Sequence, residues 1–250
     1  MDWHNRFQQQ AAWTASVRQY LLSRLNLGPN SRVLEVGCGT GAVTGAIASA
    51  LGEGTRVYGL DLNLPFLRSA SQNDPHSYFT AGDALRLPFP GGLFHAVVCH
   101  FFLLWIPRPE QALAEMVRAA RPGGAVIAFA EPDYGGRIDY PPALEALGQQ
   151  QSAALREQGA DPEMGRKLSG LFHAAGLRDV ETGLLGGQWK GMPSAEQLAS
   201  EWAVLEDDLN GKIAPEALAH LRRLDAEAWQ TGQRVLFVPT FYAIGWKSME

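Results

Sequence analysis

The chain has 250 residues, of which 46% are hydrophobic and 19% charged, and its formal net charge is −5 at pH 7. This composition is typical of an ordinary globular protein, and the length suits one core with insertions rather than two large domains. No apolar run reaches the roughly 18 residues of a membrane span, and an acidic chain without a long basic run argues against a nucleic-acid substrate.

The cysteines and the first residues of the chain indicate the cellular compartment in which the protein works. Cys38 and Cys99 are the only cysteines, and they stand in no metal-binding or redox spacing. This pattern favours a reducing compartment without a disulfide framework. Because no basic segment followed by an apolar stretch opens the sequence, we expect no secretory signal and a cytoplasmic protein.

The first predicted element is helical. Residues 4–27 carry apolar side chains at helical spacing, which predicts one or two helices ahead of the core. Within them, Phe7 and Trp13 either pack the helix onto the core or close a site as a lid. Since Gly28, Pro29 and Asn30 interrupt the pattern, we expect a helical segment or lid over residues 1–30 and the main domain over residues 31–250.

A glycine-rich turn follows. Residues 33–45 read VLEVGCGTGAVTG, which predicts a short buried strand, a turn and the start of a helix. Glycine permits positive φ and close approach to a ligand, and a helix start offers free N–H groups to an anion. The spacing of Gly37, Gly39 and Ala42 fits a dinucleotide site, so a nicotinamide or flavin enzyme stays open. Glu35 lies inside the apolar strand, where a carboxylate needs a cationic or hydrogen-bonding partner.

An acid, one spacer residue and G-x-G-x-G resemble the first motif of the class I S-adenosylmethionine (SAM) dependent methyltransferases, of the type that acts on quinones and other small molecules. The resemblance implies a Rossmann-like α/β fold, a doubly wound seven-stranded sheet of order 3-2-1-4-5-7-6 with its last strand antiparallel. It also implies that this turn cradles the amino acid part of SAM, with Glu35 facing the ammonium group directly or through water. The residues concerned here are Glu35, Gly37, Cys38, Gly39 and Gly41.

The next helix and strand are predicted over residues 42–51 and 56–60, with Asp61 at the strand's end and Leu62 after it, and the resemblance makes both candidates to contact the cofactor. An acid about 20 residues beyond a glycine turn accepts both hydroxyls of a ribose in doubly wound folds. Nicotinamide enzymes share this feature, so it does not discriminate. The alternative is that Asp61 caps the helix that begins near Leu64.

A third strand, residues 77–81, leads into Gly82, Asp83 and Ala84, followed by L-P-F. This stretch resembles the methyltransferase pattern in which the acid accepts from the adenine amino group and the small residue's backbone donates to a ring nitrogen. Glu35, Asp61 and Asp83 would then share the edge at which open α/β sheets bind ligands. A nicotinamide enzyme would not require the third of these acids.

Residues 94–99 predict the fourth strand. The family usually has an acid after the phenylalanine, where this chain has His95, but that position lies far from the expected ligand edge. His100 lies at the other end, beside the cofactor. With an unperturbed pKa near ~6.5 it is a candidate general base, and the alternative is a structural histidine. No N-P-P-Y type sequence follows, which argues against amide and exocyclic amine substrates.

The remaining elements alternate with two insertions. Helices over residues 110–120 and 166–176 and strands over 125–130, 178–185 and 234–247 complete the pattern, with Pro239 predicting a bend or an edge position. Residues 134–162 and 187–233 are expected to be cap-like insertions over the site. Five residues are candidates to contact the methyl acceptor, and the alternative for each is a structural role in packing or in a turn. They are Trp13, Asp133, Tyr134, Trp189 and Tyr242.

We therefore predict a SAM-dependent methyltransferase that acts on a small organic acceptor, releases S-adenosylhomocysteine and needs no metal. The alternatives are an NAD(P)-dependent oxidoreductase and a non-catalytic SAM-binding regulator. The sequence fixes neither the acceptor atom, which is O, N, S or C, nor the oligomeric state.

Overall fold

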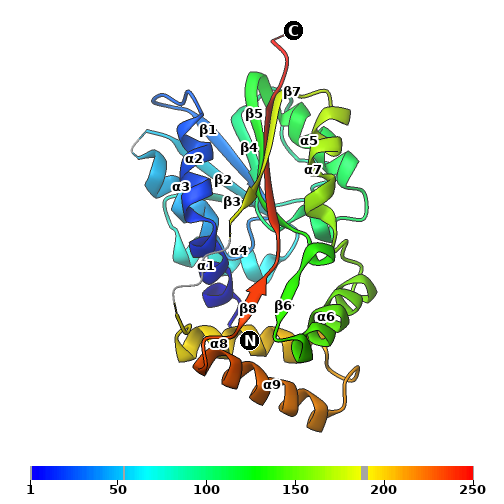
Figure 1. Ribbon diagram of the computed structural model, residues 1–250. Coiled ribbons are helices and arrows are strands. Elements are labelled where there is room, and N and C mark those ends of the chain that lie inside the picture. Colours follow the sequence, from blue (N-terminus) through cyan, green and yellow to red (C-terminus); the bar gives the residue numbers. More distant parts are fainter. Residues whose placement is uncertain (1, 53, 187–190, 250) are drawn as a thin grey trace.

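The computed structural model describes residues 2–52, 54–186 and 191–249 and contains one central sheet (Figure 1). Its strand order is β3-β2-β1-β4-β5-β9-β7, and only β9 runs antiparallel to its two neighbours. Numbered within the sheet, this is 3-2-1-4-5-7-6, so the predicted fold class is confirmed. The strands are β1 Arg32–Val36, β2 Arg56–Asp61, β3 Tyr78–Ala81, β4 Phe94–Cys99, β5 Ala120–Pro132, β7 Arg178–Leu185 and β9 Thr240–Trp246.

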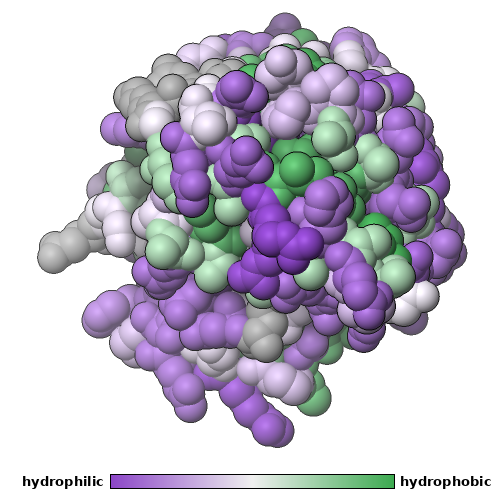
Figure 2. Space-filling model, turned by 60° about the horizontal axis from the view of Figure 1, so that its bottom comes forward, coloured by the Kyte–Doolittle hydropathy of each residue, from purple (hydrophilic) through white to green (hydrophobic). Residues whose placement is uncertain are grey.

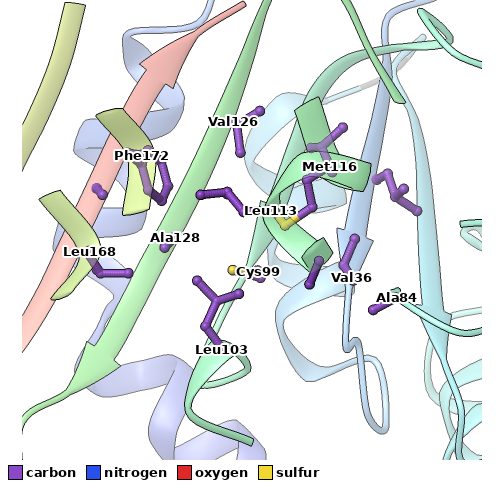
Figure 3. Packing of buried hydrophobic residues seen from close by; sticks show 14 of the residues in the cluster. Val36, Ala84, Cys99, Leu103, Leu113, Met116, Val126, Ala128, Leu168 and Phe172 are labelled. Carbon is purple, nitrogen blue, oxygen red and sulfur yellow. The ribbon is translucent and has the colours of Figure 1, made fainter. Parts of the chain in front are cut away.

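Helices cover both faces of the sheet, which is why its central strands are apolar on both sides (Figure 1). On one face α2 and α3 contribute to a core with Val33, Val98 and Ile127, while α5 and α7 pack with Leu34, Val97 and Val126 on the other. Figure 3 shows Leu113 and Met116 of α5 and Leu168 and Phe172 of α7 in this second core. The helices are α2 Ala15–Ser23, α3 Ala42–Leu51, α4 Leu64–Asn73, α5 Pro109–Ala119 and α7 Met164–Ala174.

The last predicted strand divides at Pro239. β8 (Val235–Phe237) pairs with β6 (Ile138–Tyr140) in a separate two-stranded sheet, and β9 enters the main sheet after the bend. The edge position is wrong for β9, because it lies between β5 and β7 and β7 forms the margin. Proline has no N–H to give to a ladder, so Pro239 falls between the two strands.

The described parts of the two insertions meet at one end of the sheet, below it in the view of Figure 1. Helices α6 (Glu145–Glu157), α8 (Ala195–Asp208) and α9 (Pro215–Gln230) lie there together with β6 and β8. They share a small hydrophobic cluster of their own: Leu147, Ala154, Trp202, Leu205 and Leu209. We call this unit the cap. On the face turned forward in Figure 2, hydrophilic residues surround a smaller group of hydrophobic ones.

None of the helices within the described ranges combines the length and the apolar character that crossing a bilayer requires.

Candidate active site

A cavity of about 500 Å³ lies between the ends of the parallel strands, the N-terminal helix α1 (Trp3–Trp13) and the cap. Most of the residues predicted to contact the cofactor line it, because the carboxyl ends of adjacent parallel strands share one edge of the sheet. They are Glu35, Gly37, Cys38, Gly39, Asp61, Leu62, Asp83, Ala84 and His100. Gly41 stands behind the wall as the N-cap of α3.

The glycine turn depends on backbone that other residues rarely adopt. Gly37 has φ 75° and Gly39 has φ 52°. A Cβ atom on Gly37 would overlap the ring of Phe102, and one on Gly39 would lie 2.9 Å from Cε2 of Phe7. The N–H groups of Gly37 and Cys38 donate to the Leu60 carbonyl at 2.8 and 3.0 Å, which fixes the turn to β2. A side chain at either glycine would therefore disturb the cavity wall.

Glu35 is buried in β1, with 1% of its surface exposed. The hydroxyl of Thr44, on α3, donates a hydrogen bond to its carboxylate. Burial raises the pKa of Glu35 to about 8, while the Thr44 hydrogen bond and the Arg18 charge oppose that shift. Thr44 thus provides one hydrogen-bonding partner of the kind that the sequence predicted for this acid. Among the described residues that line the cavity, none is paired with Glu35 as a positively charged partner.

Asp61 and Asp83 occupy the neighbouring strand ends. The carboxylate of Asp61 accepts from the Gly39 N–H and the Asn63 N–H, each at 2.8 Å. Asn63, not Asp61, caps α4, so the capping alternative for Asp61 is wrong. Asp83 accepts from the Leu85 N–H at 2.8 Å. Each carboxylate oxygen retains a second lone pair for a ligand.

His100 lies in the cavity wall but is held as a neutral ring. Its Nε2 lies 2.9 Å from Oγ1 of Thr14, and Arg18 donates to the same hydroxyl at 3.2 Å. Burial, followed by the Arg18 charge, lowers the pKa of His100 to about 3. A general base works best when its pKa lies near the working pH. The geometry therefore favours a hydrogen-bonding role over proton abstraction.

We expect the His100 ring to show no titration between pH 8 and pH 5, because a pKa of about 3 leaves it almost wholly neutral there. The measurement is an NMR pH series on the ring carbons, with His100→Asn used to assign the resonance. A midpoint inside that window would contradict the burial argument and restore His100 as a candidate base.

The N-terminal helix forms another wall of the cavity, and Phe7, one of the two aromatic residues considered for a lid, lies in it. Trp3, Arg6, Phe7 and Gln10 of α1 all line the cavity. The rings of Trp3 and Phe7 are centred 5.7 Å apart, and Arg6 donates to Glu201 of α8 at 2.5 Å. The helical spacing predicted this helix, but not which of its faces meets the cavity.

Residues 101–106 form another wall, and Glu131 fixes its backbone. The buried carboxylate of Glu131 accepts from the N–H groups of Phe102, Leu103 and Leu104 at 2.9, 2.8 and 3.2 Å. Burial raises its pKa to about 7, and the three hydrogen bonds oppose the shift. Glu131 thus holds the start of the short helix at Leu103–Trp105 and has no exposed surface.

Of the five candidate acceptor contacts, Tyr134 lines the cavity. Asp133 is instead paired with Arg166, whose Nε donates to it at 2.5 Å, and Tyr242 donates to Glu181 at 3.3 Å. Trp13 is 48% exposed, with the Arg6 guanidinium 4.9 Å from its ring centre. Trp189 lies outside the described residues. Trp13, Asp133 and Tyr242 are not among the described residues that line the cavity. Asp133 and Tyr242 contact partners distant in sequence, whereas Trp13 lies against Arg6 of its own helix.

The cap supplies a further wall of the cavity. Sequence reasoning predicted a cap but none of these side chains, since their placement depends on how α6 and α8 pack. They are Leu155, Gln158, Val204, Asp207 and Asp208.

Known proteins resemble this chain in sequence, most clearly over residues 34–128, and in the fold of nearly the whole chain. A family model described as a methyltransferase domain matches residues 34–128. A demethylmenaquinone methyltransferase of Lysinibacillus sphaericus is 31% identical over 190 residues, which cover 70% of this chain and 80% of the relative. One of Renibacterium salmoninarum is 37% identical over 120 residues, 47% of this chain and 49% of the relative, so the chain spans about half the length of that relative.

A solved structure of Haemonchus contortus phosphoethanolamine N-methyltransferase 2, in complex with phosphomonomethylethanolamine and S-adenosylhomocysteine, has a TM-score of 0.61 to this chain. The match covers 94% of this chain and 52% of that one at 18% identity, so it concerns the fold.

Proposed function

The chain belongs to the class I SAM-dependent methyltransferases, and we propose that it binds SAM along the glycine turn and transfers the methyl group to a small organic acceptor held under the cap. The oxidoreductase alternative is set aside by this membership. The observation that carries the proposal is the convergence of Glu35, Asp61 and Asp83 on one cavity that continues to the cap.

The residues present fit SAM on their own chemistry. The glycine turn leaves a space that a Cβ atom at Gly37 or Gly39 would fill. Glu35 is a buried acid that a positively charged ligand group would stabilise as the carboxylate. We infer that Glu35 holds the ammonium group, Asp61 the ribose hydroxyls, and Asp83 with the Ala84 backbone the adenine. When bound, SAM supplies an electrophilic methyl group on a sulfonium.

The protein's contribution is alignment and exclusion of water. Apolar side chains from α1 and residues 101–106 line the cavity, among them Phe7, Phe102 and Ile106. They would keep the acceptor in line with the methyl group and shield the reaction from solvent. We propose that residues 1–30 act as a lid, that the two insertions complete the acceptor chamber, and that His100 positions a bound group rather than removing a proton.

The test is turnover. The purified protein is incubated with SAM and a panel of phenols, thiols, amines and quinols, and S-adenosylhomocysteine and methylated product are followed by mass spectrometry. We expect SAM to bind, NADH not to bind, and at least one acceptor to be methylated. SAM binding without turnover of any acceptor would favour the non-catalytic regulator, and tight NADH binding without SAM binding would reject the proposal.

Binding of S-adenosylhomocysteine is expected to tighten about three- to tenfold from pH 6 to pH 7. The free protein holds Glu35 largely protonated below its pKa of about 8, whereas the ligand's ammonium group favours the carboxylate. Binding therefore releases a proton and strengthens as the pH rises towards 8. Calorimetry in two buffers of different ionisation enthalpy measures the released proton. Glu35→Gln, which cannot titrate, should bind weakly and without this pH dependence; an equal dependence in the variant would contradict the assignment.

A further inference from the structure

Behind the cap wall of the cavity lies a chain of buried polar side chains. Arg234 donates to Asp225 at 2.6 Å and to Asp139 at 2.8 Å, and Arg137 donates to the other oxygen of Asp139 at 2.6 Å. Arg137 also donates to the side-chain oxygen of Gln151 at 2.5 Å. These bonds join β6, the segment before β8, α6 and α9 into one network.

The network ends at Asp208 on α8. Gln151 Nε2 donates to one oxygen of Asp208 at 2.9 Å, and Gln158 Nε2 donates to the other at 3.0 Å. The orientation of the Gln151 amide is forced, because a guanidinium only donates and a carboxylate only accepts. Two side-chain amides thus donate to the two carboxyl oxygens of Asp208.

The charges of this network do not balance. It contains the carboxylates of Asp139, Asp208 and Asp225 and the guanidinium groups of Arg137 and Arg234. Asp139 and Asp225 each have an arginine within 2.8 Å, whereas no ion pair among the described residues includes Asp208. The uncompensated negative charge therefore resides on Asp208.

Asp208 is 8% exposed and lies in the wall of the cavity. A buried charge is costly unless an opposite charge approaches it, and two neutral amides do not supply one. Asp207, its neighbour, also lines the cavity, and Arg6, the only lysine or arginine among the described lining residues, is already paired with Glu201. The open side of Asp208 thus lacks positive charge.

On the basis of the proposed function, we propose that the acceptor is an amine, whose ammonium group binds against Asp208 and Asp207 while its apolar part lies on Tyr134, Trp105 and Val204. Aromatic faces and carboxylates together favour a cation over a neutral hydroxyl. For transfer, the ammonium loses one proton to water at the rim and its nitrogen lone pair forms the bond to the methyl carbon. The carbon–sulfur bond breaks with its electron pair kept by sulfur, so the product is a methylated ammonium.

The test compares two probes of nearly the same shape, 2-phenylethylamine and 2-phenylethanol, by calorimetry on the full chain saturated with S-adenosylhomocysteine. The amine should bind at least about tenfold more tightly than the alcohol, and Asp208→Asn should reduce this preference to about threefold or less while leaving S-adenosylhomocysteine affinity unchanged. Glu206→Gln is the matched control, since this exposed acid of α8 pairs with Arg222 outside the cavity. It should keep the full preference.

Asp207→Asn covers the case in which Asp208→Asn does not fold, because Asp207 is exposed and accepts no side-chain hydrogen bond among the described residues. It should reduce the amine preference about threefold. Equal binding of amine and alcohol by the wild type, or an unchanged preference in every variant that folds, would overturn the amine proposal. Turnover of phenols or quinols in preference to amines would overturn it and leave the methyltransferase proposal standing, whereas failure to bind S-adenosylhomocysteine would remove both.

Discussion

Asp61→Ala is expected to weaken SAM binding at least about tenfold, which corresponds to about 1.4 kcal/mol. The Asp61 carboxylate lies in the cavity wall and also accepts from the Gly39 and Asn63 N–H groups. Alanine therefore removes both the proposed acceptor for the ribose hydroxyls and an anchor of the glycine turn. Calorimetry with SAM measures the loss.

Two further variants separate these contributions. Asp61→Asn keeps one carbonyl oxygen and should bind more tightly than the alanine variant. Gly39→Val should match or exceed the alanine effect, since φ is 52° at this position and the added Cβ would lie 2.9 Å from the Phe7 ring. Unchanged affinity in both Asp61→Ala and Gly39→Val, with melting temperatures near that of the wild type, would place SAM elsewhere.

Glu131→Ala should have the largest effect on stability, lowering the free energy of unfolding by about 3 kcal/mol or more. Its carboxylate accepts three N–H groups at the start of the short helix Leu103–Trp105, and alanine would leave all three without that partner. Because residues 101–106 include the walls Phe101, Phe102, Trp105 and Ile106, methyl transfer should also fall. Urea unfolding followed by circular dichroism measures the stability change.

The graded control is Glu131→Gln. Its remaining carbonyl oxygen can still accept from Phe102 and Leu103, which share Oε1 in the wild type, so the loss should be smaller, about 1–2 kcal/mol. An alanine variant as stable as the glutamine variant would mean that these backbone groups find other partners.

The strands, the glycine turn and the acids of the proposed SAM site could be predicted because each is marked by a short stretch of sequence. Short apolar runs marked β1, β2 and β4, and the glycines marked the turn in which Gly37 and Gly39 have positive φ. Parallel strands place their carboxyl ends at one edge, so Glu35, Asp61 and Asp83 could be assigned to one cavity before any contact was known. Likewise, Pro239 marked a break, since it has no N–H to donate.

The acceptor half could not be predicted in the same way, because its side chains meet through long-range packing. Asp133 follows β5 and Tyr242 lies in β9, yet Arg166 and Glu181 engage them away from the cavity. His100 stands where a base was predicted, but burial and Arg18, from a helix far earlier in the chain, keep it neutral.

By itself, the sequence marked the strands, the glycine turn and the three acids at strand ends, since these follow from single segments and from the shared direction of parallel strands. The order of the sheet was what the resemblance to the methyltransferases implied. Only the tertiary structure decided which faces of α1, α6 and α8 close the cavity and that Asp208 carries an unbalanced charge there. The physical reason is that burial and electrostatic pairing are properties of groups distant along the chain, and they exist only once the cap has packed against the sheet.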